Sequence, residues 1–282
     1  MKTFRKIQSI HNAPETMMGP IKLRQAFPLQ GIEQVSPFIL LHHFDFTYAP
    51  YENNFHVAPH PHRGFCPITF MFEGSIEHED SLGNKKVIGD NEVQWINAGR
   101  GIIHSEKADK AFVERGGRSQ GIQLWINIPR AQKMNPASYQ PITKNEVVLT
   151  EKAGVEFRLV SGSYDGKKGP AHSNVFTAMS RMNTGSQDTL TFPSGNNVCF
   201  YILEGELILN ENQTIKQHDL VIFDQEDGEI KLEAKSNSKL LLMAGEPIDE
   251  PLVTHGPFVM TSQTEILEAM RDYQQGKMGF LS

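Results

Sequence analysis

Short runs in which apolar residues dominate or alternate with polar ones recur along the chain, and they predict β-strands. Each run is rich in β-branched or aromatic residues and is bounded by Gly, Pro, Asn or Asp. The clearest runs lie at residues 67–72, 92–97, 121–128, 155–162, 175–182, 197–205, 206–210, 220–224, 230–234 and 239–245. Evenly spaced short strands are typical of a sandwich or a closed barrel, so we predict an all-β fold.

A single stretch, Thr264 to Gln275, has the spacing of an α-helix. Thr264 is the predicted N-cap, and Gly276 is the predicted stop. The apolar positions of the stretch are Ile266, Leu267, Met270 and Tyr273. We therefore expect a short C-terminal helix packed on the surface of the protein.

The same order of strands and turns occurs twice, which indicates a duplicated domain. Residues 71–83 and 87–99 contain a strand, a Glu-Gly turn, a return strand and, after an aspartate, a further strand; residues 202–214 and 215–228 repeat this order. The polar segment 130–146, with Pro136 and Pro141, is the predicted linker. We predict an N-terminal barrel at residues 1–136, and a C-terminal barrel with the tail and helix at 137–282.

Composition narrows the class of protein without changing the fold. The 282 residues are 39% hydrophobic and 21% charged, and the formal net charge of −6 gives no reason to expect direct binding to nucleic acid. Cys66 and Cys199 stand far apart in apolar surroundings and are predicted to be reduced core thiols. Because the sequence contains neither a secretory signal nor a membrane-spanning run, we interpret it as a soluble cytoplasmic protein.

Two pairs of potential metal ligands have the spacing of residues on one face of a strand. His60 and His62 are two residues apart, and so are His104 and Glu106. If both pairs lie on neighbouring strands and face the barrel interior, three imidazoles and one carboxylate meet at one point. Such a set suits Fe, Zn, Ni, Cu, Co or Mn, and on an octahedral ion it leaves two positions open, as in a catalytic site. Because the chain has 11 histidines, a chance His-x-His without metal is the alternative.

The remaining histidines have no such partners. His42 and His43 are adjacent and are predicted to serve in packing or to line a pocket, whereas His56 is predicted to lie behind the metal ligands. His78 is expected at an exposed hairpin end, and the surface is predicted for His11, His172, His218 and His255. The second half of the chain lacks the ligand set, with FPSGNN (192–197) where the first half has HPHRG. We therefore predict one metal for each chain, in the N-terminal barrel.

Several segments resemble the pirin family of the cupin superfamily. They are HPHRGF (60–65), EGSIEHEDSLG (73–83), GDNEVQWINAGRGIIHSE (89–106), GIQLWINIP (121–129), GEPIDEPLVTHGPFVMTSQTEI (245–266) and DYQQGKMG (272–279). The resemblance implies a bicupin, with two antiparallel jelly-roll-type barrels. It also implies a metal site of His60, His62, His104 and Glu106 that usually holds iron, here Fe(II).

The same resemblance implies a metal-dependent dioxygenase that opens flavonols such as quercetin with O2, and Glu106 could also act as its catalytic base. An alternative is an iron-dependent, redox-responsive protein that binds and regulates a transcription factor or a metabolic enzyme. The sequence departs from the family at Cys66, where pirins commonly carry Glu, and at His218, where a glycine is usual. We expect the first departure to affect the substrate pocket, and a thiol beside a redox metal could be oxidised or bind it.

Overall fold

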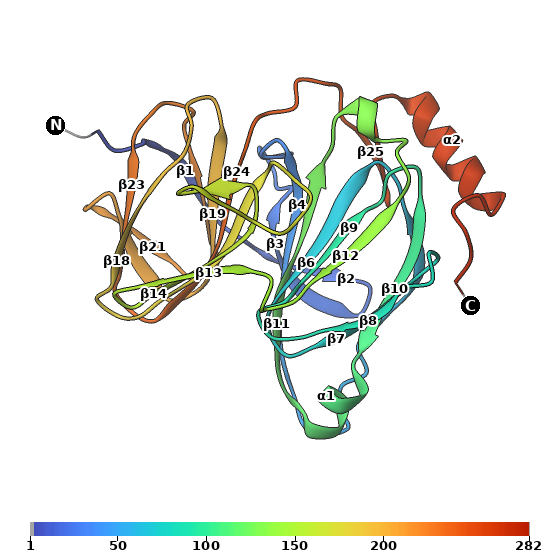
Figure 1. Ribbon diagram of the computed structural model, residues 1–282, viewed down its shortest axis with the longest axis horizontal. Coiled ribbons are helices and arrows are strands. Elements are labelled where there is room, and N and C mark those ends of the chain that lie inside the picture. The colour runs from blue at the N-terminus through green and yellow to red at the C-terminus, as the bar shows by residue number, and fades with distance from the viewer. Residues whose placement is uncertain (1–2, 282) are drawn as a thin grey trace. The chain divides into compact units, whose positions relative to one another are not determined.

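The computed structural model describes residues 3–281, and β-strands make up most of it (Figure 1). The chain divides into two compact units. The first barrel comprises Phe44–Lys144 and the residues from Ile248 onward, and the second barrel comprises the residues up to His43 and Asn145–Pro247. Among the described residues, no helix is both long enough and apolar enough to cross a membrane. The predicted all-β fold is confirmed.

The first barrel is built from two antiparallel sheets. One sheet has the order β12-β9-β6-β11-β4: β12 (Ser138–Ile142), β9 (Val93–Asn97), β6 (Phe65–Glu73), β11 (Gly117–Asn127) and the part of β4 (Phe38–Tyr48) from Phe44 onward. The other sheet has the order β5-β10-β7-β8: β5 (His56–His62), β10 (Ile102–Ala108), β7 (Ile76–Asp80) and β8 (Lys85–Ile88). The barrel also contains α1 (Lys110–Arg115), the 3-10 turn Arg130–Gln132, the hairpin of β25 (Val253–His255) and β26 (Phe258–Met260), and α2 (Gln263–Gln274).

The second barrel also has two antiparallel sheets. One has the order β1-β22-β19-β24-β17-β14-β13: β1 (Ile7–Asn12), β22 (Asp219–Phe223), β19 (Asn197–Glu204), β24 (Ser238–Gly245), β17 (Phe176–Met182), β14 (Val155–Ser161) and β13 (Val148–Lys152). The other has the order β18-β23-β20-β21: β18 (Gln187–Thr191), β23 (Glu229–Ala234), β20 (Glu206–Leu209) and β21 (Gln213–Lys216). Two hairpins complete it, β15 (Ser163–Tyr164) with β16 (Lys167–Lys168), and β2 (Glu15–Met18) with β3 (Ile21–Phe27), which pairs with the start of β4.

The apolar residues that alternate along the predicted strands also fill the interior of the second barrel. Val198, Phe200 and Ile202 of β19 point to the same side of their sheet and are fully buried. They belong to one apolar cluster with Ile230 and Leu232 of β23, from the other sheet. The interior of the second barrel is therefore a hydrophobic core to which both of its sheets contribute.

The Glu-Gly turns of the repeated pattern have the same backbone conformation in both barrels. Gly74 follows β6 with φ 83°, and Gly205 follows β19 with φ 89°. A Cβ at either position would also lie within 3.0 Å of a backbone oxygen of a neighbouring segment, that of Arg118 at Gly74 and that of Asn237 at Gly205. Positive φ and close approach both require glycine, so these positions mark equivalent turns of a duplicated fold.

The compact units differ from the single boundary after residue 136 that the sequence predicts. Strand β1 pairs with β22, so the N-terminal residues belong to the second barrel. The C-terminal tail belongs to the first barrel, where Phe258 of β26 forms a bridge with Arg63. Segments from both ends of the chain therefore complete the barrel that is more distant in sequence.

The C-terminal helix is confirmed, with corrections at its start and on its surface. Its N-cap is Ser262, not Thr264, because the Ser262 side chain accepts a hydrogen bond from the Glu265 N–H at 3.2 Å. Gly276 has φ 72° and lies just beyond the last turn, as predicted for the stop. Leu267 is 58% exposed and so does not belong to the buried face. The short helix α1, with Asp109 as its N-cap, is not among the predicted elements.

Candidate metal centre

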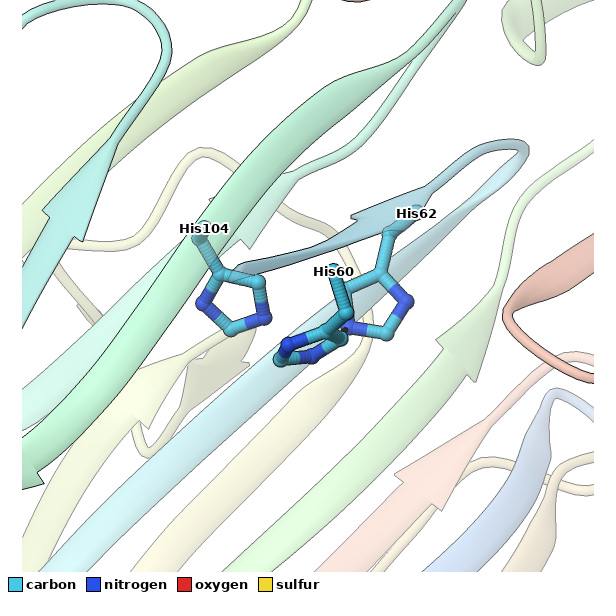
Figure 2. Close-up of side chains that lie close together, drawn as sticks. All are labelled: His60, His62 and His104. Carbon is cyan, nitrogen blue, oxygen red and sulfur yellow. Dashed lines mark hydrogen bonds between the residues drawn. The ribbon is translucent and has the colours of Figure 1, made fainter. Parts of the chain in front are cut away.

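Strands β5 and β10 pair so that His60 lies directly opposite His104. His62 lies two residues from His60 and points to the same side of β5 (Figure 2). The ring centroids of His60, His62 and His104 are 4.3 to 4.9 Å apart, and one nitrogen from each lies within 4.8 Å of the other two. Among residues 3–281, no other group of three or more His, Cys, Asp or Glu side chains meets this criterion.

The hydrogen bonds of His60 and His62 leave their Nε2 atoms facing each other. His60 Nδ1 lies 2.9 Å from the Ala58 carbonyl oxygen, and His62 Nδ1 lies 3.4 Å from that of Pro257. Since a carbonyl only accepts, each Nδ1 carries the proton, and each Nε2 presents a lone pair. The two Nε2 atoms are 3.1 Å apart, an arrangement without a proton to share between them. It is the tautomer that a metal ligand needs.

His104 supplies a direct test of whether this pocket suits a metal. Its ring is fully buried, yet neither Nδ1 nor Nε2 has a hydrogen-bond partner. Burial is the largest cause that lowers the pKa of His104 well below its usual value, followed by the charges of the neighbouring His62 and His60. Burial also lowers the pKa of His62. The rings of His62 and His104 are therefore neutral at pH 7, and a cation would satisfy the His104 nitrogen atoms that are otherwise left unpaired.

Glu106 does not belong to the three-histidine group. Pairing of β10 with β5 is irregular between His104, opposite His60, and Glu106, opposite Val57. The Glu106 carboxylate is buried, and its Oε1 accepts hydrogen bonds from Gln94 Nε2 at 2.6 Å and Thr69 Oγ1 at 3.4 Å. Both donors come from the opposite sheet, so they hold this carboxylate inside the first barrel. Its place in the ligand set remains a prediction.

A second buried pair lies beside His104 and corrects the expectation for His78. The His78 ring is fully buried, its centroid is 5.4 Å from that of His104, and it stacks on Tyr139 at 4.2 Å. His78 Nε2 donates to Asp80 Oδ2 at 3.0 Å, and Asp80 Oδ1 accepts from the Leu82 N–H at 2.9 Å. His78 and Asp80 are a third pair two residues apart, a signal that could have placed them inside the barrel. Thr69 and Gln94 are polar residues in otherwise apolar strands, which could likewise have indicated that their side chains serve a polar site inside the barrel.

Two other histidines also differ from the expectation. His56 begins β5 and its side chain is exposed, so it does not support the ligands from behind. In the second barrel, His218 is not an isolated surface residue, since its ring lies 5.5 Å from that of His43. His43 is buried, and its Nδ1 lies 3.1 Å from the Tyr201 hydroxyl, which agrees with a role in packing.

Cys66 points away from the three histidines. Along β6, Phe65 packs its ring 5.1 Å from that of His62, and Thr69 reaches Glu106, so the odd positions face the interior. Cys66 faces the other side, where it interacts with the Trp95 side chain. Burial raises the pKa of its thiol to about 12. The expectation that this thiol could bind or react near a metal is therefore not supported by its position.

The C-terminal tail closes over the strand that carries His60 and His62. The buried Lys133 ammonium donates to the carbonyl oxygens of Gly64 at 2.7 Å and Val259 at 3.2 Å. Arg63 donates through Nη1 and Nη2 to Asp272 Oδ2, each at 3.1 Å. These contacts hold the segment around Pro257, whose carbonyl oxygen accepts from His62. Residues near the end of the chain thus orient a candidate metal ligand.

Known proteins are similar in sequence to this chain over nearly its whole length. A family model described as Pirin matches residues 20–126, and one described as the Pirin C-terminal cupin domain matches residues 178–279. A Pseudomonas aeruginosa protein named "Putative quercetin 2,3-dioxygenase PA2418" is 35% identical over 97% of this chain and 98% of its own length. Pirin-1 of Arabidopsis thaliana is 38% identical over 87% of this chain and 84% of its own length.

A solved structure extends the likeness to three dimensions. The crystal structure of a quercetin 2,3-dioxygenase from Acinetobacter baumannii superposes with a TM-score of 0.93 at 30% identity, covering 99% of this chain and 100% of that one. The chain thus has two β-barrels, a three-histidine group in the first of them, and similarity to pirins in both sequence and backbone fold. On these grounds the chain belongs to the pirin family, within the bicupins.

Proposed function

We propose that this pirin is a metal-dependent dioxygenase that opens flavonols such as quercetin with O2. The observation that carries the proposal is His104, a buried imidazole with both nitrogens unpartnered, facing His60 and His62. The names of the Pseudomonas aeruginosa relative and of the Acinetobacter baumannii structure point to the same reaction. One divalent transition metal fits the donor set, and Fe(II) is the first candidate among the metals that imidazole accepts.

Four residues would hold this metal: His60, His62, His104 and, as the fourth ligand, Glu106. A metal held there would polarise a bound hydroxyl oxygen and lower its pKa, which favours the flavonolate that reacts with oxygen. Gln94, which donates to Glu106 Oε1 at 2.6 Å, fixes the orientation of the carboxylate. We propose that this carboxylate also takes the proton of the flavonol hydroxyl, as a general base.

The aromatic wall next to His62 suits a flat substrate. Trp125 is half-buried, and its ring centroid lies 5.4 Å from that of His62 and 4.3 Å from that of Phe65. Flavonols consist of planar aromatic rings, which pack well against such side chains. We propose that Trp125 orients the substrate ring beside the metal and keeps water from it, while the fully buried Phe65 packs behind Trp125 and holds its ring in place.

The proposal is tested by removing ligands and measuring both metal and reaction. His60→Ala and His104→Ala are expected to lose bound metal, measured by elemental analysis, and to lose quercetin-dependent oxygen uptake. His56→Ala is the matched control, because His56 lies on the same strand with its side chain exposed. If both variants lose metal and retain the quercetin rate, or if the fully metallated protein takes up no oxygen, the proposed reaction is wrong. Unchanged metal content in both variants would refute the ligand assignment.

A separate variant tests the two roles of Glu106. Glu106→Gln preserves the shape of the side chain and an oxygen that Gln94 can donate to, but it removes the charge and the base. We expect reduced metal content and, at equal metal occupancy, a rate that is lower by about a hundredfold or more. Glu79→Gln is the control, since Glu79 lies between His78 and Asp80 on β7 and points to the opposite face. Full activity of Glu106→Gln would contradict the role as base.

A further inference from the structure

A cavity of about 420 Å³ lies within the second barrel, which lacks the histidine set. Strands β13, β14 and β18 and the β15–β16 hairpin surround it. Its volume falls in the range of sites for small organic molecules. The cavity is lined by Thr150, Lys152, Val155, Phe157, Leu159, Ser163, Tyr164, Asp165, Lys167, Asp188, Thr189 and Thr191.

One side of the cavity is apolar. Val155, Phe157 and Leu159 alternate along β14 and are all buried, so they present one face of this strand to the cavity. The Tyr164 ring packs against them, with its centroid 5.3 Å from that of Phe157. This surface would bury the apolar body of a ligand, because aromatic and aliphatic side chains gain most from excluding water.

The polar side of the cavity contains a carboxylate without a cation. Asp188 is half-buried, and its Oδ1 accepts a hydrogen bond from the Thr189 N–H at 2.9 Å. Among the residues that the structure describes, Asp188 has no ion-pair partner. Burial raises the pKa of its carboxyl group, and the charge of Lys152 only partly opposes this. A half-buried carboxylate in a cavity wall is therefore a ready partner for a ligand cation.

The two lysines that line the cavity, Lys152 and Lys167, differ in their contacts. Lys167 donates to Thr150 Oγ1 at 2.7 Å, which ties the β15–β16 hairpin to β13. Lys152 is exposed and lines the same cavity as Asp188, but it does not form an ion pair with it within the described residues. A cation and an anion thus face one cavity without neutralising each other. A plain amine would be repelled by Lys152, and a plain carboxylate by Asp188.

We propose that this cavity binds a small zwitterion with an apolar body, of the class of hydrophobic α-amino acids. Its ammonium group pairs with Asp188, its carboxylate pairs with Lys152, and its side chain packs over Phe157 and Tyr164. This binding site is independent of the three histidines, and it does not rest on the proposed oxygenation of flavonols. It gives the second barrel a ligand of its own.

L-Phenylalanine is the probe, and the full chain is titrated with it by calorimetry and by two-dimensional NMR. Phenethylamine, which lacks the carboxylate, and 3-phenylpropionate, which lacks the ammonium group, are titrated alongside. We expect L-phenylalanine to bind at least about tenfold more tightly than either, because each loses one charged hydrogen bond. Shifted amide signals are expected in residues 150–167 and 187–191.

Two variants assign the charges. Asp188→Asn and Lys152→Met are each expected to weaken L-phenylalanine binding about tenfold, while Asp188→Asn leaves the affinity for 3-phenylpropionate equal or higher. Glu151→Gln is the matched control, since Glu151 is an exposed carboxylate next to Lys152 that does not line the cavity. No binding of L-phenylalanine up to about 10 mM would overturn the proposal. Equal binding of the three probes, or full binding by Asp188→Asn, would overturn it as well.

Discussion

Asp272→Asn should destabilise the first barrel and weaken its candidate metal site, although Asp272 lies in α2, far from His62 in the sequence. The Arg63 side chain is 4% exposed, and both of its terminal nitrogens donate to one Asp272 oxygen. Removing one partner of a buried ion pair costs about 3–5 kcal/mol. Asn still offers one oxygen, and Arg63 Nε keeps its bond to the Arg100 carbonyl at 2.6 Å. We therefore expect a loss of about 2 kcal/mol in the free energy of unfolding.

The metal affinity should fall along with the stability. Arg63 is bonded through its backbone to the Pro257 carbonyl and to Val259, so a loosened Arg63 loosens the tail. The Pro257 carbonyl then no longer fixes the Nδ1 proton of His62, and such outer contacts change metal affinity by about tenfold or more. Urea unfolding measures the first effect, and competition with a chelator measures the second. Glu268→Gln, an exposed change on the same helix, is the control.

The pH dependence provides a further check on this ion pair. The hydrogen bond from Lys277 is the largest cause that lowers the Asp272 pKa, and Arg63 lowers it further against the effect of burial. A lowered carboxyl pKa stabilises the folded state above the unfolded value of about 4, and this stabilisation is lost as the pH falls through the folded pKa. The difference in the free energy of unfolding between wild type and Asp272→Asn should thus be constant from pH 7 to about 5 and shrink below about 4.

An unchanged metal affinity in an Asp272→Asn protein that is clearly less stable would refute the link to His62.

Three other substitutions have defined outcomes. Gly64→Ala should cost about 2 kcal/mol or more by thermal unfolding, because Gly64 has φ 88° and its Cβ would meet the Val259 carbonyl oxygen; a stable variant would contradict this close approach. Cys66→Ser should retain its metal by elemental analysis, since this thiol faces away from the histidines, and metal loss would show otherwise. Phe200→Ala should destabilise the second barrel by about 3–5 kcal/mol in urea, as Phe200 is fully buried; a loss below about 1 kcal/mol would mean a loosely packed core.

Local patterns predicted the strands because the barrel interior imposes a period of two on each of them. The predicted strand at 92–97 is β9, Val93–Asn97, and the one at 220–224 is β22, Asp219–Phe223. The same alternation brought His60, His62 and His104 to one point. Where a residue's environment depended on the opposite sheet, as for Glu106 and its donor Gln94, the spacing along one strand contained no information about it.

His78 shows why the rest could not be predicted. In sequence it stands after a Glu-Gly turn among three acidic residues, which is typical of an exposed hairpin. In the structure the strand continues into the barrel, and the charged neighbours Glu77 and Glu79 bond with Lys85 on the outer face. The Asp80 carboxylate then keeps His78 Nε2 satisfied inside. Burial of this kind depends on pairing between distant strands, such as Glu106 with His78, which no local window contains.

Because of the contacts between the C-terminal tail and the segment of β5, the surroundings of His62 form in a fixed order during synthesis. A ribosome makes residues 56–62 long before residues 257–272, so the emerging first barrel has its three histidines but lacks the Pro257 carbonyl and the Asp272 carboxylate. The contacts that orient His62 are complete only once residues 257–272 have been synthesised. We therefore expect high-affinity metal binding at the candidate site only after residue 272 has emerged, and weaker binding in a nascent chain that stalls before Pro257.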